Sequence, residues 1–180
     1  MTNAELAILS LIAEKPRHGY AIEQTIRERG MREWTEIGFS SIYYVLNKLE
    51  KEGFIKSSLE KAEGKGPARK IYAVTDAGRE VQLAETYRAL SLPRREVRPF
   101  LLGLSNLPVL DAAQSLEALR SYRQELQLRQ EHLLRRATEQ SNPPFYVEAM
   151  FDYSLMLLQA ELKWLDEFIR TVEEERHDKN

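Results

Sequence analysis

The stretch FSSIYYVLNKLEKEGFI, residues 39–55, predicts an amphipathic helix with an unusual outer face. A helix turns by about 100° per residue, so one side collects an apolar stripe that can be buried: Ile42, Val45, Leu46 and Leu49. Tyr44, Asn47 and Lys48 fall on the opposite side, and Tyr43 lies at the border. The stripe alone is enough to hold such a helix, so the polar and aromatic residues need another explanation.

The segments around this helix predict a helix-turn-helix followed by a β-wing. Turn and cap signals such as Gly30 after the second helix separate the segments from one another. The expected elements are helices at 4–14 and 19–29, a helix from a cap at Ser40 or Ser41 to Gly53, strands at 54–59 and 70–74, and a helix from Thr75.

The second half predicts two long helices after a proline-rich joint. Three prolines between residues 91 and 108 indicate a change of direction, and Asp111 can cap a helix that ends near Gln140. A last helix follows the SNPP break and covers residues 145–176. We expect three regions: a winged helix-turn-helix domain at residues 1–90, a joint at 91–110 and a helical dimerisation domain at 111–180. The expected fold class is mainly α with a small β-hairpin.

A heptad pattern runs along the last predicted helix. Its apolar residues recur in alternating steps of four and three: Phe151, Leu155, Leu158, Leu162, Leu165 and Ile169. More apolar and aromatic residues lie off this pattern, and a hairpin of two helices cannot cover both sets. The simplest prediction is a symmetric homodimer in which the C-terminal helices pack together. The alternative is a monomer whose helices fold back on the N-terminal domain.

The outer face of the 39–55 helix suits the major groove of DNA, into which an α-helix fits. Asn47 can make a bidentate contact to adenine, and Lys48 can reach guanine or a phosphate. Hydroxyl groups that can donate to phosphates come from Ser40, Ser41, Tyr43 and Tyr44. The simpler interpretation is a solvated helix face, with Tyr43 half buried against the preceding helix.

Residues 61–70 carry four basic side chains and one acidic side chain. A cationic hairpin tip with Lys65, Arg69 and Lys70 can follow a phosphate backbone or enter a minor groove, although charged surface hairpins are common. Tyr20, at the start of the second helix, either assists in holding a phosphate or is a core residue with an exposed hydroxyl. We favour the core for its ring.

Three motifs resemble the PadR family of bacterial transcriptional regulators: HGYAI at 18–22, SSIYYVLNKLEKEGFI at 40–55 and ARKIYAVTDAGRE at 68–80. They cover most of residues 4–90 in the order and spacing of the family. The two C-terminal helices are similar in shape to the longer branch of that family. The resemblance implies a homodimeric winged-helix protein that binds a double-stranded DNA operator with two-fold related half-sites and usually represses transcription.

The resemblance also implies roles for single residues. Tyr43, the hydroxyl residues before it, Asn47 and Lys48 match positions that face DNA in the family. The family often has proline where this chain has Tyr44, so Tyr44 adds a group to the reading face. Effectors in the family range from phenolic acids to hydrophobic drugs. An effector pocket at Trp164, Met156 and Tyr153 is one interpretation of these residues, and we favour the alternative, a packed helical core.

No motif points to an enzyme, a metal centre or a cofactor. The sequence has no cysteine, its three histidines fall in different elements, and the HExxH, GxSxG and glycine-rich phosphate-loop motifs do not occur. No signal peptide or membrane-length apolar run is recognised, so we expect no membrane partner and a cytoplasmic location. The main rival to a DNA-binding regulator is a helical adaptor that uses its winged helix to bind protein.

Overall fold

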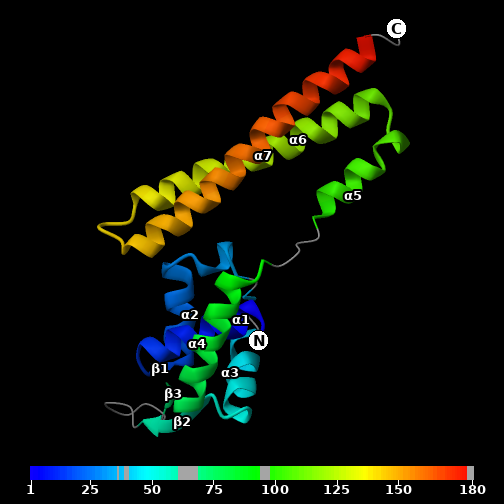
Figure 1. Ribbon diagram of the computed structural model, residues 1–180. Helices are drawn as coiled ribbons and strands as arrows, with labels where there is room; N and C mark the ends of the chain where they lie inside the picture. The colour runs from blue at the N-terminus through cyan, green and yellow to red at the C-terminus, as the bar shows by residue number, and fades with distance from the viewer. Residues whose placement is uncertain (36, 39–40, 61–68, 94–97, 178–180) are drawn as a thin grey trace. The chain divides into compact units, whose positions relative to one another are not determined.

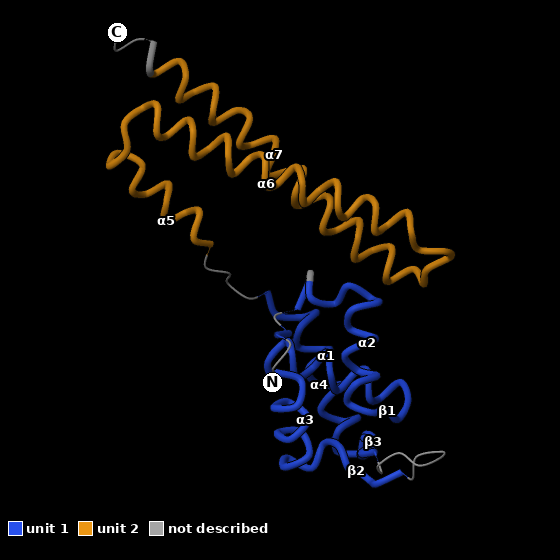
Figure 2. Tube along the Cα trace, turned by 180° about the vertical axis from the view of Figure 1, so that it is seen from behind, with its two compact units in different colours: residues 1–95 blue, residues 96–180 orange. Residues whose placement is uncertain are grey.

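A computed structural model describes residues 1–35, 37–38, 41–60, 69–93 and 98–177 (Figure 1). The chain forms two compact units, Met1–Arg95 and Glu96–Asn180 (Figure 2). Unit 1 combines helices with a small antiparallel sheet, and the described part of unit 2 is built from helices. The predicted fold class, mainly α with a small β-structure, is confirmed.

Unit 1 has the predicted order of three helices, a hairpin and a helix. Its elements are α1 (Asn3–Glu14), β1 (Arg17–His18), α2 (Gly19–Glu28), the 3-10 helix η1 (Met31–Glu33), α3 (Ser41–Lys51), β2 (Ile55–Glu60), β3 (Arg69–Val74) and α4 (Asp76–Ser91). The strands form one antiparallel sheet in the order β1-β3-β2. The two-residue strand β1 was not predicted, because two residues are too few to show an alternating pattern.

The core of unit 1 lies between α1, α2, α3 and the sheet. α1 is buried on nearly every side, and a capping box between Thr2 and Glu5 fixes its start. The buried side chains that form the core include Ile8, Leu9, Leu11, Ile12, Ile22, Ile26, Ile42, Leu46, Leu49, Ile55 and Tyr72. Because α3 places one apolar stripe into this core, its opposite face is turned outward.

The junction between the hairpin and α4 is tightly packed. Thr75 caps α4 by accepting a hydrogen bond from the Gly78 N–H, and its own hydroxyl donates to the Gly53 carbonyl oxygen. A Cβ atom on Gly78 would lie 2.0 Å from the carbonyl oxygen of Phe54, so only glycine allows the helix to begin so close to β2. The junction thereby fixes the hairpin relative to α3 and α4.

Unit 2 consists of α5 (Pro99–Ser105), the 3-10 helix η2 (Leu107–Val109) and two long antiparallel helices, α6 (Ala112–Thr138) and α7 (Phe145–His177). Asp111 caps α6 in a capping box with Gln114, as predicted for the cap. α5 lies in the stretch that was expected to be a joint. Its partly buried residues, Phe100 and Leu104, pack against the core of the long helices.

The heptad pattern of α7 packs against α6 of the same chain. One cluster holds Leu116, Leu119 and Leu126 of α6 with Leu158, Leu162, Leu165 and Ile169 of α7, while Phe151 and Leu155 are partly buried. The sequence pattern predicted that these residues face a second copy of the chain. A heptad pattern is spaced for packing against one partner helix, which can belong to the same chain or to another copy. In this structure the partner helix of α7 is α6.

Candidate nucleic-acid interface

α3 presents an aromatic and polar face to solvent. Its stripe of Ile42, Val45, Leu46 and Leu49 is buried, as predicted. Tyr43 and Tyr44 are 58% and 69% exposed, and Asn47 is exposed on the same helix. Ser41 begins the helix and donates its hydroxyl to the Gly38 carbonyl oxygen, whereas Ser40 lies outside the described residues. The face of α3 opposite its buried stripe therefore carries two large, mostly exposed aromatic rings.

Tyr43 contacts the start of α2. A Cβ atom added to Gly19 would lie 2.8 Å from Cε1 of Tyr43, so the tyrosine ring packs directly on the glycine backbone. The ring is therefore held at the helix-turn-helix crossing while more than half of the side chain stays exposed. Tyr44, the next residue of the helix, is more exposed than Tyr43.

Lys48 is engaged by a buried carboxylate of α1. Its Nζ donates to Oε1 of Glu5 at 2.6 Å, and Glu52 lies 3.9 Å away. Burial raises the pKa of Glu5, but hydrogen bonds from Lys48 and from the Thr2 backbone N–H outweigh burial, so the pKa of Glu5 is lowered overall. The hydrogen bond to Glu5 in turn raises the pKa of Lys48. Lys48 thus ties α3 to α1 as well as lying on the predicted reading face.

Lys70 is likewise tied to α3. Its Nζ donates to Oε2 of Glu50 at 2.7 Å and lies 5.2 Å from the centre of the Tyr72 ring. Glu50 also accepts a hydrogen bond from the Ser57 hydroxyl, and the bonds from Lys70 and Ser57 lower the pKa of Glu50. This network fixes the root of the wing against α3. Lys65, the other predicted lysine of the wing, lies outside the described residues.

Arg69 and Tyr20 form a second contact at the root of the wing. The Cζ atom of Arg69 lies 5.7 Å from the centre of the Tyr20 ring, and the His18 ring stacks on Tyr20 at 6.1 Å between centroids. Tyr20 is 55% exposed, so the interpretation of its ring as a core residue is wrong. The residue stands at the start of α2, where the wing meets the helix-turn-helix.

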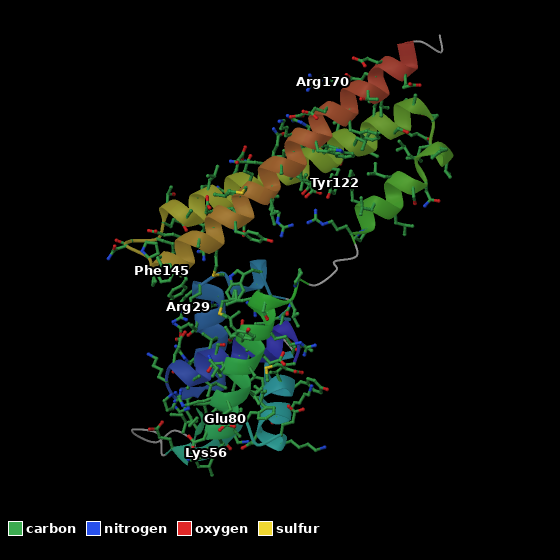
Figure 3. The ribbon with its side chains drawn as sticks, viewed as in Figure 1. Arg29, Lys56, Glu80, Tyr122, Phe145 and Arg170 are labelled. Atoms are coloured by element: carbon green, nitrogen blue, oxygen red, sulfur yellow. The ribbon has the colours of Figure 1, made fainter. Side chains whose placement is uncertain are left out.

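Lys56 and His18 were not among the predicted site residues. Lys56 is exposed on β2 (Figure 3), and the register places it opposite Ala73, on the sheet face that also carries Glu60 and Arg69. Two-residue alternation along β2 would have identified Lys56 once the register was known. Among the described residues, no carboxylate pairs with Lys51, Lys56 or Arg69 within 4.0 Å.

Unit 2 contains a separate apolar cavity of about 270 Å³. Its lining is mostly apolar, with Arg98 and Glu161 at one side: Phe100, Leu101, Leu104, Leu157, Ala160 and Trp164. Trp164 was one of three residues predicted for an effector pocket. The other two, Met156 and Tyr153, are exposed on α7 and do not line this cavity.

Comparison with known proteins identifies the family of unit 1. Residues 8–84 match the transcriptional regulator PadR-like family. This chain contains a PadR-like domain. The match covers the helix-turn-helix, the wing and the first half of α4, including each described residue of the predicted DNA-binding set. No curated protein matches the chain by sequence.

Solved structures extend the likeness of fold to both units. The chain resembles Bacillus subtilis PadR in complex with operator DNA, with 21% identity, a TM-score of 0.74 and coverage of 93% of this chain and 98% of that one. It resembles Bacillus subtilis PadR in complex with p-coumaric acid with 20% identity, a TM-score of 0.75 and coverage of 94% and 98%. The PadR-like regulator BC1756 from Bacillus cereus has 21% identity, a TM-score of 0.68 and coverage of 96% and 97%. At these identities the likeness shows the fold.

The described residues show neither a metal-ligating cluster nor a membrane-spanning helix. They hold no group of three or more metal-ligating side chains of the His, Cys, Asp and Glu type. Within the same residues, every helix falls short of the length or the apolar character needed to cross a membrane.

Proposed function

We propose that this protein is a sequence-specific DNA-binding transcriptional regulator that acts as a homodimeric repressor. The observation that carries the proposal is the outer face of α3, where Tyr43, Tyr44 and Asn47 are exposed beside the root of a basic wing. The face lies in a PadR-like domain, and a solved structure with the same fold is a complex with operator DNA. Repression is what the resemblance to the family implies.

The residues divide into two roles. Asn47 and Tyr44 are placed to meet base edges in the major groove, since α3 is the second helix of the helix-turn-helix. Contacts with phosphates fix the register of the protein on DNA without reading sequence. We assign these contacts to hydroxyl and cationic side chains: Ser41, Tyr43, Lys51, Lys56 and Arg69. Lys48 and Lys70 hold α3 against α1 and the wing, so we assign them first to positioning. Ser40 and Lys65 keep the predicted contact roles.

Binding to a duplex from the region upstream of the gene tests the proposal directly. We expect saturable binding that weakens with added salt, because each phosphate contact releases condensed counterions. Asn47→Ala should lower the affinity for the specific site by about tenfold relative to a random duplex of equal length, since one bidentate base contact contributes roughly 1–3 kcal/mol of discrimination. Asn3→Ala, at an exposed asparagine of α1, serves as the matched control.

The outcomes of this experiment separate the two candidate functions. Equal losses on specific and random duplexes would show that Asn47 does not read bases. Absence of saturable, salt-sensitive binding would favour the adaptor, in which the winged helix binds protein.

The homodimer is proposed to form through the outward stripe of α7. Tyr146, Met150, Tyr153, Leu157 and Trp164 follow one another in steps of four, three, four and seven, which is a second heptad seam beside the one that α6 covers. All five side chains are exposed in the single chain. A two-fold operator requires a two-fold protein, so a second copy of this chain is the partner that fits this stripe.

A small hydrophobic or aromatic effector is proposed to release the protein from DNA. The cavity beside Phe100 and Trp164 supports this role, because it combines aromatic walls with the charged groups of Arg98 and Glu161. A solved structure of the same fold is a complex with p-coumaric acid, so that acid is the first probe. Titration into Trp34→Phe protein, in which Trp164 is the remaining tryptophan, should change the fluorescence saturably. An unchanged signal together with unchanged DNA affinity would exclude p-coumaric acid as the effector.

A further inference from the structure

The outer face of the sheet in unit 1 brings Glu60 and Arg69 directly opposite one another. The register pairs Glu60 of β2 with Arg69 of β3, and His18 of β1 with Ile71 of β3. Opposed side chains of an antiparallel pair lie on the same face and close together, so a glutamate opposite an arginine normally forms a cross-strand ion pair. Such a pair would neutralise the arginine at the root of the wing.

The structure shows a different arrangement. Oε2 of Glu60 lies 3.1 Å from Nε2 of His18, and the other ring nitrogen of His18, Nδ1, lies 3.1 Å from the carbonyl oxygen of Lys70. Both ring nitrogens thus face oxygen atoms, and the His18 ring is held between the Glu60 carboxylate and the backbone of β3. The carboxylate of Glu60 is therefore bound across β3 to β1 rather than to Arg69.

The guanidinium of Arg69 is supported by an aromatic ring instead of a carboxylate. It lies over Tyr20, whose ring is stacked nearly parallel to His18 with an interplanar angle of 11°. A ring face holds a cation in place while it leaves the N–H donors free for another ligand. The neighbouring Lys70 does not compete for Glu60, because its ammonium group is bonded to Glu50.

We propose that His18 and Tyr20 are positioning residues that keep Arg69 available for a DNA phosphate at the root of the wing. His18 holds the Glu60 carboxylate away from Arg69, and Tyr20 fixes the guanidinium in place. The inference rests on the proposed DNA binding. It assigns a role to the histidine and the tyrosine of the HGY motif that neither base reading nor core packing explains.

A rescue experiment tests the role of His18. In His18→Ala protein, Glu60 is released to pair with Arg69, and one phosphate contact is lost. Because both subunits of the dimer lose this contact, we expect the Kd for the duplex to rise at least about fivefold near 0.15 M salt, and the slope of log K against log salt to become shallower by about 1.8. Glu60→Gln in the His18→Ala background should restore both values, because the neutral amide no longer neutralises Arg69. Glu60→Gln alone should leave them unchanged.

A control separates this rescue from a general gain of positive charge. Glu80→Gln changes the net charge of the same unit by the same amount at an exposed position of α4 (Figure 3). It should not rescue His18→Ala. Rescue by Glu80→Gln as complete as that by Glu60→Gln, or an unchanged salt slope in His18→Ala, would overturn the role of His18.

The aromatic support is tested by a second pair of variants. Tyr20→Phe keeps the ring beneath Arg69 and should lose less affinity and less salt slope than Tyr20→Leu, which should resemble Arg69→Gln in both values. Equal binding by the Phe and Leu variants would show that the ring has no positioning role. Circular dichroism shows whether His18→Ala folds, and His18→Gln replaces it if it does not. The two Tyr20 variants stay informative in that case, because Tyr20 is an exposed side chain.

Failure of the inference is distinguishable from failure of the proposed function. Unaltered protein that does not bind the duplex would remove the DNA-binding function. Unaltered protein that binds, with His18 and Tyr20 variants that bind equally well, would remove only the positioning role.

Discussion

Unit 1 and unit 2 bury their apolar side chains to very different extents. Eleven large side chains are fully buried among the described residues, and ten of them belong to unit 1; the eleventh is Leu165 of α7. Unit 1 surrounds a centre with three helices and a sheet, whereas α6 and α7 meet along a single line. A pair of helices leaves most of each cylinder uncovered, and the outer sides of α7 carry Tyr146, Tyr153 and Met156 in solvent.

This difference in burial indicates which unit forms a closed core without a partner. The core of unit 1 is formed by α1, α2, α3 and the sheet of the same chain, and its exposed apolar residues on α4 are Leu83, Tyr87 and Leu90. The exposed apolar residues of α7 recur at regular heptad spacing, and an exposed apolar stripe of this kind is typical of an interaction site. The sequence contains two tryptophans, Trp34 in unit 1 and Trp164 in unit 2, so single-tryptophan variants report on each unit separately.

The largest expected effect is on the stability of unit 1. Leu46→Ala removes a fully buried side chain from a closed core and should lower the free energy of unfolding by about 3 kcal/mol, because the cavity adds to the lost transfer energy. Urea unfolding followed through Trp34, in Trp164→Phe protein, measures this loss.

The same substitution tests whether the units are independent. In Trp34→Phe protein, the Trp164 signal should keep its urea midpoint when Leu46 is changed. A shift of both midpoints by the same amount would mean that the two units unfold together, which would contradict their independence.

The second effect concerns the association of unit 2. Tyr153→Glu places a charge in the outward stripe of α7 and should weaken the dimer about a hundredfold, or roughly 2.8 kcal/mol, as the loss of a central aromatic contact does. Sedimentation over a range of protein concentrations measures the change. Gln159→Glu adds the same charge to an exposed position of α7 outside the stripe and should leave the dimer intact. Dimerisation of the Tyr153→Glu protein at unchanged affinity would place the interface elsewhere.

Local sequence patterns predicted the elements well. The buried stripe of α3, the cap at Asp111 and the two strands of the wing follow from periodicity and cap chemistry within a few residues of each position. These signals are local, and the structure keeps them because nothing in the tertiary packing opposes them.

Contacts between distant residues could not be predicted in the same way. The heptad pattern of α7 is identical for a partner in the same chain and a partner in another copy, so only the structure shows that α6 covers it. The sequence alone predicts that Lys48 faces solvent. In the structure it donates a hydrogen bond to Glu5, which is far away in the sequence. The same holds for His18 and Glu60, which are brought together by a two-residue strand.

The ion pair between α1 and α3 should have a smaller effect on unit 1 than its core. Glu5→Gln removes the charge partner of Lys48 and should cost about 1 kcal/mol at neutral pH. Because the pKa of Glu5 is lowered in the folded state, the stabilisation is present above the unfolded pKa of about 4.3 and is lost as the pH falls through the folded pKa.

Urea unfolding through Trp34 between pH 3 and pH 7 measures this contribution. The curves for Glu5→Gln and the unaltered protein should converge at the acid end. Glu52→Gln, which removes the more distant carboxylate near Lys48, is the control and should change stability little. A constant difference between Glu5→Gln and the unaltered protein at every pH would assign the loss to packing rather than to charge.

The smallest expected effect is on the stability of unit 2 and concerns a polar contact between α6 and α7. The hydroxyl of Tyr122 on α6 (Figure 3) donates to Oε1 of Glu161 on α7 at 2.8 Å, and its ring stacks on Phe100 at 4.3 Å between centroids. Tyr122→Phe keeps the stacking and removes the hydrogen bond, so we expect a loss of about 0.5 kcal/mol in the unfolding followed through Trp164.

Alkaline pH should expose the same contact in the unaltered protein. Burial, followed by the hydrogen bond to Glu161, raises the pKa of Tyr122 to about 12. A phenol whose folded pKa is raised stabilises the fold fully below its unfolded pKa of about 10 and loses that contribution as the pH rises toward the folded value. The stability difference between the unaltered protein and Tyr122→Phe should therefore shrink and then reverse in sign between pH 10 and pH 12, because only the tyrosine must stay protonated to remain buried. A difference that is the same at pH 8 and pH 11.5 would show that the Tyr122 hydroxyl is solvated and contributes nothing to the contact between α6 and α7.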